Sequence, residues 1–210
     1  MIYEDVSNVD HASRRNLLFS AFTGRHEVET SGKSTDIHAM LATTYGIERR
    51  GKTSIDTRKA SKELGVSQRT IQRWLKEENK PKSDNLKKIQ TKSRQAASTK
   101  RGRQTALKAS PKNVHFKKYG AHLTVKGVQG PPPGSGGKAY TRDRLSQLEL
   151  DPDTFSALMD AFEQGGEKSA VAYLEGIYND KYVADWSFGT IRELTFNDLS
   201  TRGSRDPRSL

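Results

Sequence analysis

The stretch that decides the fold is Thr57–Lys76, TRKASKELGVSQRTIQRWLK. Two short helical patterns flank Gly65, which stands where a left-handed backbone conformation makes a sharp turn cheap. Ala60 is small enough for the first helix to pack closely on the second. Ser67 is expected to cap the second helix by accepting a hydrogen bond from a backbone amide. Together these features predict a helix-turn-helix.

The second predicted helix has one apolar face and a polar remainder. Ile71, Trp74 and Leu75 stand at positions i, i+3 and i+4, which predicts a buried face. Arg can bond guanine bidentately and Gln can bond adenine, and the first turn of a recognition helix enters the major groove. The predicted base readers are therefore Gln68, Arg69 and Gln72. The predicted DNA-binding set also includes Ser67 and Arg73, with phosphate contacts expected from Thr57, Arg58, Thr70 and Lys76. An ordinary helical hairpin is the alternative.

Charge is distributed very unevenly along the chain. Residues Lys76–Lys118 contain fourteen Lys or Arg and three acids, an excess of eleven that equals the net charge of the whole protein. Residues Asp143–Asp198 contain twelve acids and four bases. A basic segment directly after a DNA-reading motif predicts phosphate contacts, with a solvated basic linker as the alternative. The expected contacts are Lys80, Lys82, Lys87, Lys88, Lys92, Arg94, Lys100, Arg101 and Arg103.

Composition excludes several classes of protein. The chain of 210 residues has no cysteine, which excludes disulfides and thiolate zinc sites. No apolar run is long enough to span a membrane, and the first sixteen residues lack the apolar core of a signal peptide. The Gly32-Lys33-Ser34 sequence lacks the earlier glycine of a phosphate-binding loop, and five scattered histidines give no metal pattern. We therefore expect a cytoplasmic, nucleoid-associated protein with no cofactor, no metal and no membrane partner.

The order of elements predicts an α+β protein in several parts. Residues 1–16 are expected to be disordered, and short helices are expected at 16–22 and 36–44, followed by a loop up to the helix-turn-helix. The expected parts are an all-helical helix-turn-helix domain at 17–84, a basic linker or helix at 85–112, an acidic α+β module at 113–199 and a disordered tail at 200–210.

The acidic module is expected to combine short strands with two helices. Residues 113–126 predict two short strands or one bent strand, and 127–137 predict a Pro/Gly loop without regular structure. Residues 141–150 fit either a strand or a helix. Asp151 and Pro152 predict the start of a helix with Phe155, Leu158, Met159 and Phe162 inward. A second helix is expected at 167–178, with Val171, Leu174 and Ile177 inward, and a strand at 190–196.

In the order of these features the chain resembles the telomere terminal proteins of Streptomyces-type linear chromosomes and plasmids. The matching segments are LFSAFTGR at Leu18–Arg25, LGVSQRTIQRWL at Leu64–Leu75, LELDPDTFSALMDAFEQGG at Leu148–Gly166, AYLEGIYNDKY at Ala172–Tyr182 and the strand Ile191–Phe196. The resemblance spans most of residues 17–198.

The resemblance implies a protein that becomes covalently joined to the 5′ ends of linear DNA. In such a protein a side-chain hydroxyl takes a nucleotide, and the new 3′-OH primes end replication. The acceptor candidates here are Thr141, Ser135 and Thr124. The implied partners are duplex DNA, single-stranded DNA ends, a DNA polymerase and a telomere-associated protein. No activating base is visible beside the hydroxyls, so the chain itself is not expected to be an enzyme.

Two other functions compete with this one. A plasmid or phage transcriptional regulator would use the same helix-turn-helix, with the acidic module forming a homodimer. A nuclease or recombinase is the third hypothesis, but the sequence shows no catalytic constellation for it.

Overall fold

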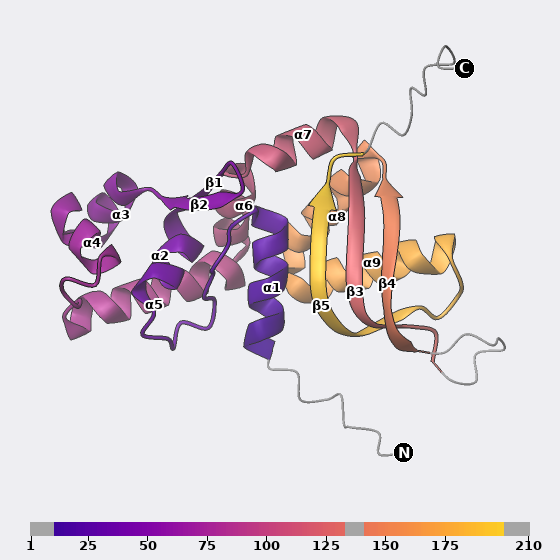
Figure 1. Cartoon of the computed structure of the whole chain (residues 1–210), viewed down its shortest axis with the longest axis horizontal. Helices are drawn as coiled ribbons and strands as arrows, with labels where there is room; N and C mark the ends of the chain where they lie inside the picture. The colour runs from indigo at the N-terminus through magenta and orange to yellow at the C-terminus, as the bar shows by residue number, and fades with distance from the viewer. Residues whose placement is uncertain (1–10, 133–140, 200–210) are drawn as a thin grey trace, which may run out of the picture.

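The computed structural model describes residues 11–132 and 141–199. The molecule is elongated, with the helix-turn-helix at one end and a three-stranded sheet at the other (Figure 1). Each end has its own cluster of buried apolar side chains. The fold is α+β, as the sequence predicted.

The DNA-reading end is built from five short elements and a long helix. Asp36 and Asp56 cap the first two helices through bonds from the amides of Ala39 and Lys59, each at 2.9 Å. The five elements are α2 (Ile37–Tyr45), β1 (Gly46–Arg49), β2 (Lys52–Ile55), α3 (Thr57–Leu64) and α4 (Gln68–Leu75). Their core contains Met40, Leu41, Tyr45, Ala60, Leu64, Ile71, Trp74 and Ile89.

The prediction that this end is all-helical is wrong, because the expected loop is a β-hairpin. Strands β1 and β2 pair antiparallel, with Gly46 opposite Ile55 and Arg49 opposite Lys52. The two residues of the turn, Arg50 and Gly51, both have positive φ, at 53° and 75°. This is the backbone that a two-residue hairpin turn requires. An Arg at the first turn position concealed it, because the usual sequence signal is Asn-Gly or Asp-Gly.

The basic segment is helical and links the two ends. It forms α5 (Ser83–Ser98) and α6 (Lys100–Lys108). Of the two structures predicted for residues 85–112, a linker or a helix, the structure shows helix. Ile89 of α5 is buried in the core of the helix-turn-helix, whereas Ala96 and Ala97 are buried in the core of the sheet. One helix thus contributes to both cores.

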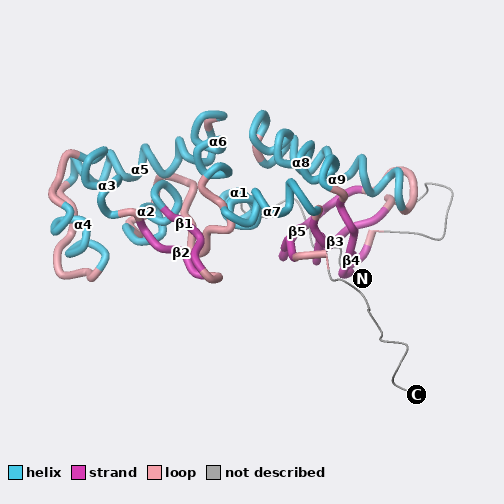
Figure 2. The backbone as a smooth tube through the Cα atoms, turned by 90° about the horizontal axis from the view of Figure 1, so that it is seen from above, coloured by secondary structure: helices cyan, strands magenta, loops and turns pink. Residues whose placement is uncertain are grey.

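The other end is a sheet with helices packed on one face (Figure 2). The strands are antiparallel and lie in the order β4-β3-β5. The elements are α1 (His11–Thr23), α7 (Pro111–Tyr119), β3 (Ala121–Gly130), β4 (Arg142–Leu150), α8 (Pro152–Gly165), α9 (Glu167–Lys181) and β5 (Ser187–Asn197).

Helix α1 belongs to the core of the sheet rather than to that of the helix-turn-helix. Leu18, Phe19 and Phe22 are buried there, and the ring of Phe22 stacks on Phe162 of α8 at 4.4 Å between centroids. The predicted 17–84 domain therefore includes residues that belong to the other core. Residues 17–23 pack against α8, which is more than a hundred positions away in the sequence. Residues 11–16, expected to be disordered, form the first turns of this helix.

Residues 113–126 were predicted as two short strands or one bent strand, but only the part from Ala121 onward forms a strand. Residues up to Tyr119 form helix α7, because Pro111 stands at its first position, and Gly120 ends it. Residues 127–130, expected to be irregular, are the end of β3. A Cβ on Gly127 would lie 1.9 Å from the carbonyl oxygen of Thr190, so this glycine permits the close approach of β5.

The other elements predicted for this end are present in the structure. Residues 142–150 form a strand, and the strand predicted at 190–196 extends over 187–197. The cap by Asp151 is confirmed, and all four predicted inward side chains of α8 are buried. Helix α9 is three residues longer than expected, with Val171, Leu174 and Ile177 buried. Residues 1–10, 133–140 and 200–210 lie outside the described residues, so the disorder predicted for 1–10 and 200–210 and the loop predicted for 133–137 stay predictions.

The stacked pair Phe22–Phe162 predicts the effect of a substitution in α1. Replacing Phe22 by Ala removes a fully buried ring and is expected to lower the free energy of unfolding by about 3–5 kcal/mol. Chemical denaturation followed by circular dichroism measures this loss. Val114→Ala is the matched control because Val114 is 70% exposed. An equal effect of the two substitutions would contradict the packing of α1.

Candidate nucleic-acid interface

Helix α4 is positioned as a recognition helix by its cap and its buried face. The Ser67 hydroxyl accepts a hydrogen bond from the Thr70 amide at 3.1 Å, and Gly65 ends α3 with φ 71°. Ile71 and Trp74 are buried, as predicted, and Leu75 is partly buried. The opposite side of the helix is open to solvent and carries the exposed side chains of Arg69, Gln72, Arg73 and Lys76.

Gln68, at the start of α4, is held by a residue of α3. Its Nε2 donates to the Thr57 hydroxyl at 2.8 Å, and both side chains are partly buried. The second Nε2 hydrogen and the Oε1 remain for the donor–acceptor pair that an adenine edge offers. Thr57, predicted as a phosphate contact, therefore also orients a predicted base reader. The sequence did not indicate this role, because the two residues are eleven positions apart.

An acidic residue lies beside two of the predicted DNA contacts. The Glu78 carboxylate is 3.9 Å from Arg73 Nε and 3.9 Å from Lys76 Nζ. The chain bends back after α4, since Glu77 has φ 58° and the Glu78 amide donates to the Arg73 carbonyl at 3.0 Å. All three side chains are largely exposed, so the pairs are weak. Glu78 lowers the positive charge at this end of α4, a role that the sequence did not indicate.

Most of the predicted basic contacts are exposed, and two are engaged within the protein. Lys92 forms a 2.8 Å ion pair with Glu63 of α3. The prediction for Arg103 is wrong, because this side chain is only 5% exposed and is buried against α8. Its guanidinium donates to the carbonyls of Ala97, Glu163 and Gln164 at 2.9–3.0 Å. The exposed members of the set are Lys80, Lys82, Lys87, Lys88, Arg94, Lys100 and Arg101.

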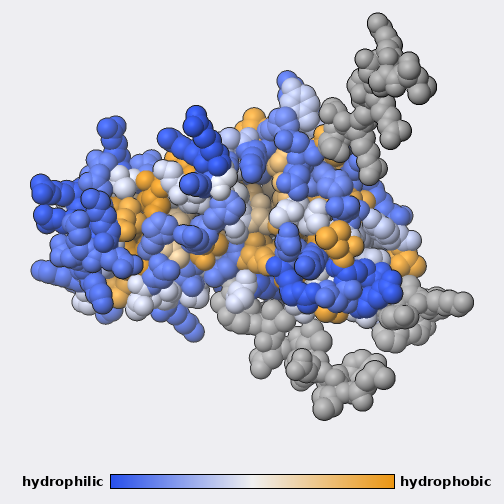
Figure 3. Space-filling view, in the orientation of Figure 1, coloured by the Kyte–Doolittle hydropathy of each residue, from blue (hydrophilic) through white to orange (hydrophobic). Residues whose placement is uncertain are grey.

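The space-filling view shows a strongly hydrophilic surface over the helix-turn-helix end (Figure 3). Helix α4 and the start of α5 lie at this end of the molecule in Figure 1. The exposed cations of the basic segment therefore begin next to the recognition helix and continue along α5. Such a surface is suited to the phosphates that flank a base-reading helix.

Two of the three hydroxyl candidates, Thr141 and Thr124, lie at the opposite end of the molecule. The Thr141 hydroxyl donates to the carbonyl oxygens of Gly130 and Pro131, at 3.2 and 3.1 Å, beside the start of β4. Thr124 lies on β3, opposite Gln147 of β4 and Thr195 of β5 in the register. Ser135 lies outside the described residues. The fold does not bring the Thr141 or Thr124 hydroxyl to the helix-turn-helix.

The described residues contain no group of three or more His, Asp or Glu side chains placed to hold a metal ion. Nor does any helix of the described ranges have the length and apolar character that crossing a membrane requires.

Comparison with known protein families matches residues 48–91 to a helix-turn-helix family. The matched segment runs from β1 into α5 and includes both helices of the motif. No curated protein matches the chain, and no solved structure matches it. The match and the geometry of α3 and α4 agree, and the chain binds DNA through this domain.

The exposed side chains of α4 predict two kinds of DNA-binding defect. Arg69→Ala and Gln72→Ala are each expected to cost about 1–3 kcal/mol of specific binding and to relax the base preference. Lys76→Ala is expected to weaken binding to every sequence alike and to reduce its salt dependence. Competition between specific and random duplexes separates the two kinds. Lys108→Ala, an exposed cation at the end of α6, is the control, and an equal loss in it would contradict the assignment to α4.

The position of Glu78 predicts a gain of function. Glu78→Gln removes a negative charge beside Arg73 and Lys76 and is expected to raise DNA affinity about two- to fivefold at low salt. Fluorescence anisotropy over a salt series measures the effect, which should fade as salt rises. Asp84→Gln, in the first turn of α5, tests whether any lost acid near the interface does the same. Unchanged affinity of the Glu78 variant would place this corner of α4 away from DNA.

Proposed function

We propose that the chain is a sequence-specific regulator that binds duplex DNA through α4. One observation carries this proposal: a capped recognition helix presents Arg69 and Gln72 to solvent while Thr57 orients Gln68, within the segment that matches a helix-turn-helix family. Arg and Gln are the side chains that read guanine and adenine edges, so the exposed surface has the chemistry of base readout. The exposed cations along α5 would add phosphate contacts on the flank.

The acidic module is proposed to join two copies of the chain. Residues 143–198 carry twelve acids against four bases, and this net negative charge repels DNA phosphates, so this part suits a protein partner better than DNA. A regulator with one recognition helix per chain gains specificity by binding as a dimer to two half-sites about one helical turn apart. A homodimer through the acidic module would leave both helix-turn-helix ends free for those half-sites.

Selection from random duplexes followed by footprinting tests the regulator proposal. We expect a recovered sequence with two-fold symmetry, protected over two half-sites, and a dimer mass by light scattering. Deleting residues 1–10 is a matched control that leaves every described element intact. Selection that recovers no common sequence would contradict sequence-specific regulation, and a single asymmetric half-site bound by a monomer would contradict the homodimer.

The resemblance to telomere terminal proteins supports a second candidate function. Two of the segments that carry it, Leu18–Arg25 and Leu148–Gly166, are distant in sequence but contribute to one core, where Phe22 stacks on Phe162. Four of the five matching segments thus contribute to this one core, and the fifth, Leu64–Leu75, is in the core of the helix-turn-helix. In this second proposal, a hydroxyl of the acidic module accepts the first nucleotide while the helix-turn-helix holds the end of the duplex.

Covalent labelling separates the second proposal from the first. The protein is incubated with labelled deoxynucleotide, a DNA polymerase and terminal DNA, then denatured. A terminal protein is expected to retain the label, and Thr141→Val, Ser135→Ala and Thr124→Val, tested singly, locate the acceptor. Arg69→Ala is the control for DNA placement. Absence of an adduct together with a symmetric footprint would overturn the priming role and leave the regulator.

A further inference from the structure

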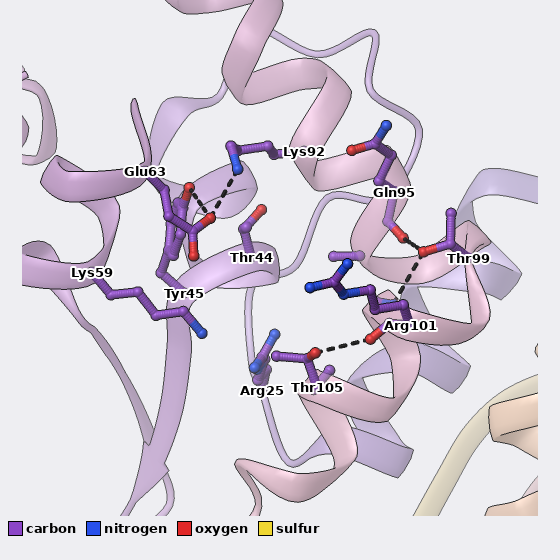
Figure 4. A pocket seen from close by; sticks show the side chains of 13 residues that line it. Arg25, Thr44, Tyr45, Lys59, Glu63, Lys92, Gln95, Thr99, Arg101 and Thr105 are labelled. Carbon is purple, nitrogen blue, oxygen red and sulfur yellow. Dashed lines mark hydrogen bonds and ion pairs between the residues drawn. The ribbon is translucent and has the colours of Figure 1, made fainter. Parts of the chain in front are cut away.

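A cavity of about 550 Å³ lies between the helix-turn-helix and the helices that follow it (Figure 4). Its walls come from α2, α3, α5 and α6, together with Arg25 from the segment between α1 and α2. Helix α4 lines no part of it. Lys59 and Glu63, the residues of α3 that face it, are roughly half a turn round the helix from Thr57, the residue that contacts α4. The cavity is therefore separate from the base-reading face of α4, although it shares Lys92 and Arg101 with the predicted phosphate contacts.

Arg25 is a buried cation without a matching anion. Its side chain is 3% exposed, and Nη1 donates to the Thr43 carbonyl. The guanidinium also lies 5.9 Å from the centroid of the Phe19 ring. Within residues 11–132 and 141–199 no carboxylate forms an ion pair with it. Burial lowers the pKa of Arg25 to about 10, so the group is charged at neutral pH. No ion pair from the described residues compensates for its desolvation.

Three further cations line the same cavity. They are Lys59 of α3, Lys92 of α5 and Arg101 of α6. Glu63 is the one acid among the lining residues that the structure describes, and it is already bonded to Lys92 at 2.8 Å and to the Tyr45 hydroxyl at 3.3 Å. Lys59, Arg25 and Arg101 lie on different sides of the space between α3 and α6 (Figure 4). The lining thus carries four positive charges against one negative charge.

We propose that this cavity binds a small molecule bearing a phosphate group. A guanidinium presents a planar fork of donors that matches phosphate oxygens, and two such groups with a Lys can neutralise a dianion. The lining also includes the side chains of Thr99 and Thr105 and the apolar side chains of Ala96 and Ala106. A cavity of this size accommodates a small organic phosphate, and its concave shape with a deeply buried Arg25 favours such a ligand over a duplex backbone.

Occupancy would connect the two ends of the molecule. Lys59 stands on the helix that positions α4, and Arg101 stands on α6, which packs against α8. An anion held by both cations would therefore add a further link between the helix-turn-helix and the sheet. This consequence rests on the proposed DNA-binding function, whereas binding of the anion itself does not.

Calorimetric titration of the full chain with inorganic phosphate and with pyrophosphate tests the site. Each titration is run at constant ionic strength against sodium chloride. We expect saturable binding at one site per chain, and the double variant Lys59→Gln, Arg101→Gln is expected to bind at least about tenfold more weakly. Arg25→Gln is expected to lose binding, and Arg25→Lys to recover part of it. The controls are Lys108→Gln and Lys117→Gln, exposed cations outside the cavity.

The surface variants keep the test decisive if Arg25→Gln fails to fold. Phosphate heats equal to those of chloride, or equal affinities in the double variant and the controls, would overturn the proposal. In a last titration, a short DNA duplex is added to the protein with and without phosphate. Two results together would refute the small-molecule site: competitive displacement of phosphate by the duplex, and weaker binding of the duplex by the double variant Lys59→Gln, Arg101→Gln. They would mean that the cavity binds DNA phosphates. If phosphate and duplex bind together, the site is distinct from the DNA-binding surface, whether or not the duplex is read sequence-specifically.

Discussion

One buried guanidinium, that of Arg103, fixes how the two ends of this molecule are joined. It donates to the carbonyl of Ala97, in the last turn of α5, and to those of Glu163 and Gln164, in the last turn of α8. Helix C-termini leave carbonyls without partners inside the helix and carry partial negative charge. A single cation therefore satisfies two helix ends that would otherwise be costly to bring together. Burial lowers the pKa of Arg103, but the three carbonyls compensate for much of the lost hydration.

The rigid connection explains how α5 can serve both cores. Because Arg103 fixes its C-terminal end against α8, the helix leaves the sheet in one direction and contributes Ile89 to the helix-turn-helix core. The exposed cations of α5 are thus presented on a fixed helix and not on a flexible linker. Ordering such a segment in advance removes an entropic cost that a disordered basic tail would incur on binding DNA.

The sequence predicted the elements whose determinants are local. The helix-turn-helix and α8 were anticipated because their caps, turns and apolar stripes fall within twenty residues of one another, as with Ser67, Gly65 and Ile71. The hairpin at Arg50–Gly51 was missed because its turn has an unusual first residue, and α7 because β-branched and aromatic side chains concealed a helix begun by Pro111. Arg103 and Arg25 were misjudged or overlooked since their partners come from distant segments. Nothing in a linear pattern distinguishes a buried arginine from an exposed one.

Arg103 and Arg25 are both buried, but they differ in the number of hydrogen-bond acceptors that surround the guanidinium. Arg103 and Arg25 are almost equally buried, at 5% and 3% exposed. Arg103 has three carbonyl partners on two helix ends, which leaves little capacity for a ligand. Arg25 has one carbonyl, an aromatic ring and a cavity lined by three more cations. A fold that only needed to bury an arginine would supply acceptors for it, as α5 and α8 do for Arg103. Among the described residues Arg25 has one such acceptor and no paired carboxylate, and this difference from Arg103 is what favours an anion in the cavity.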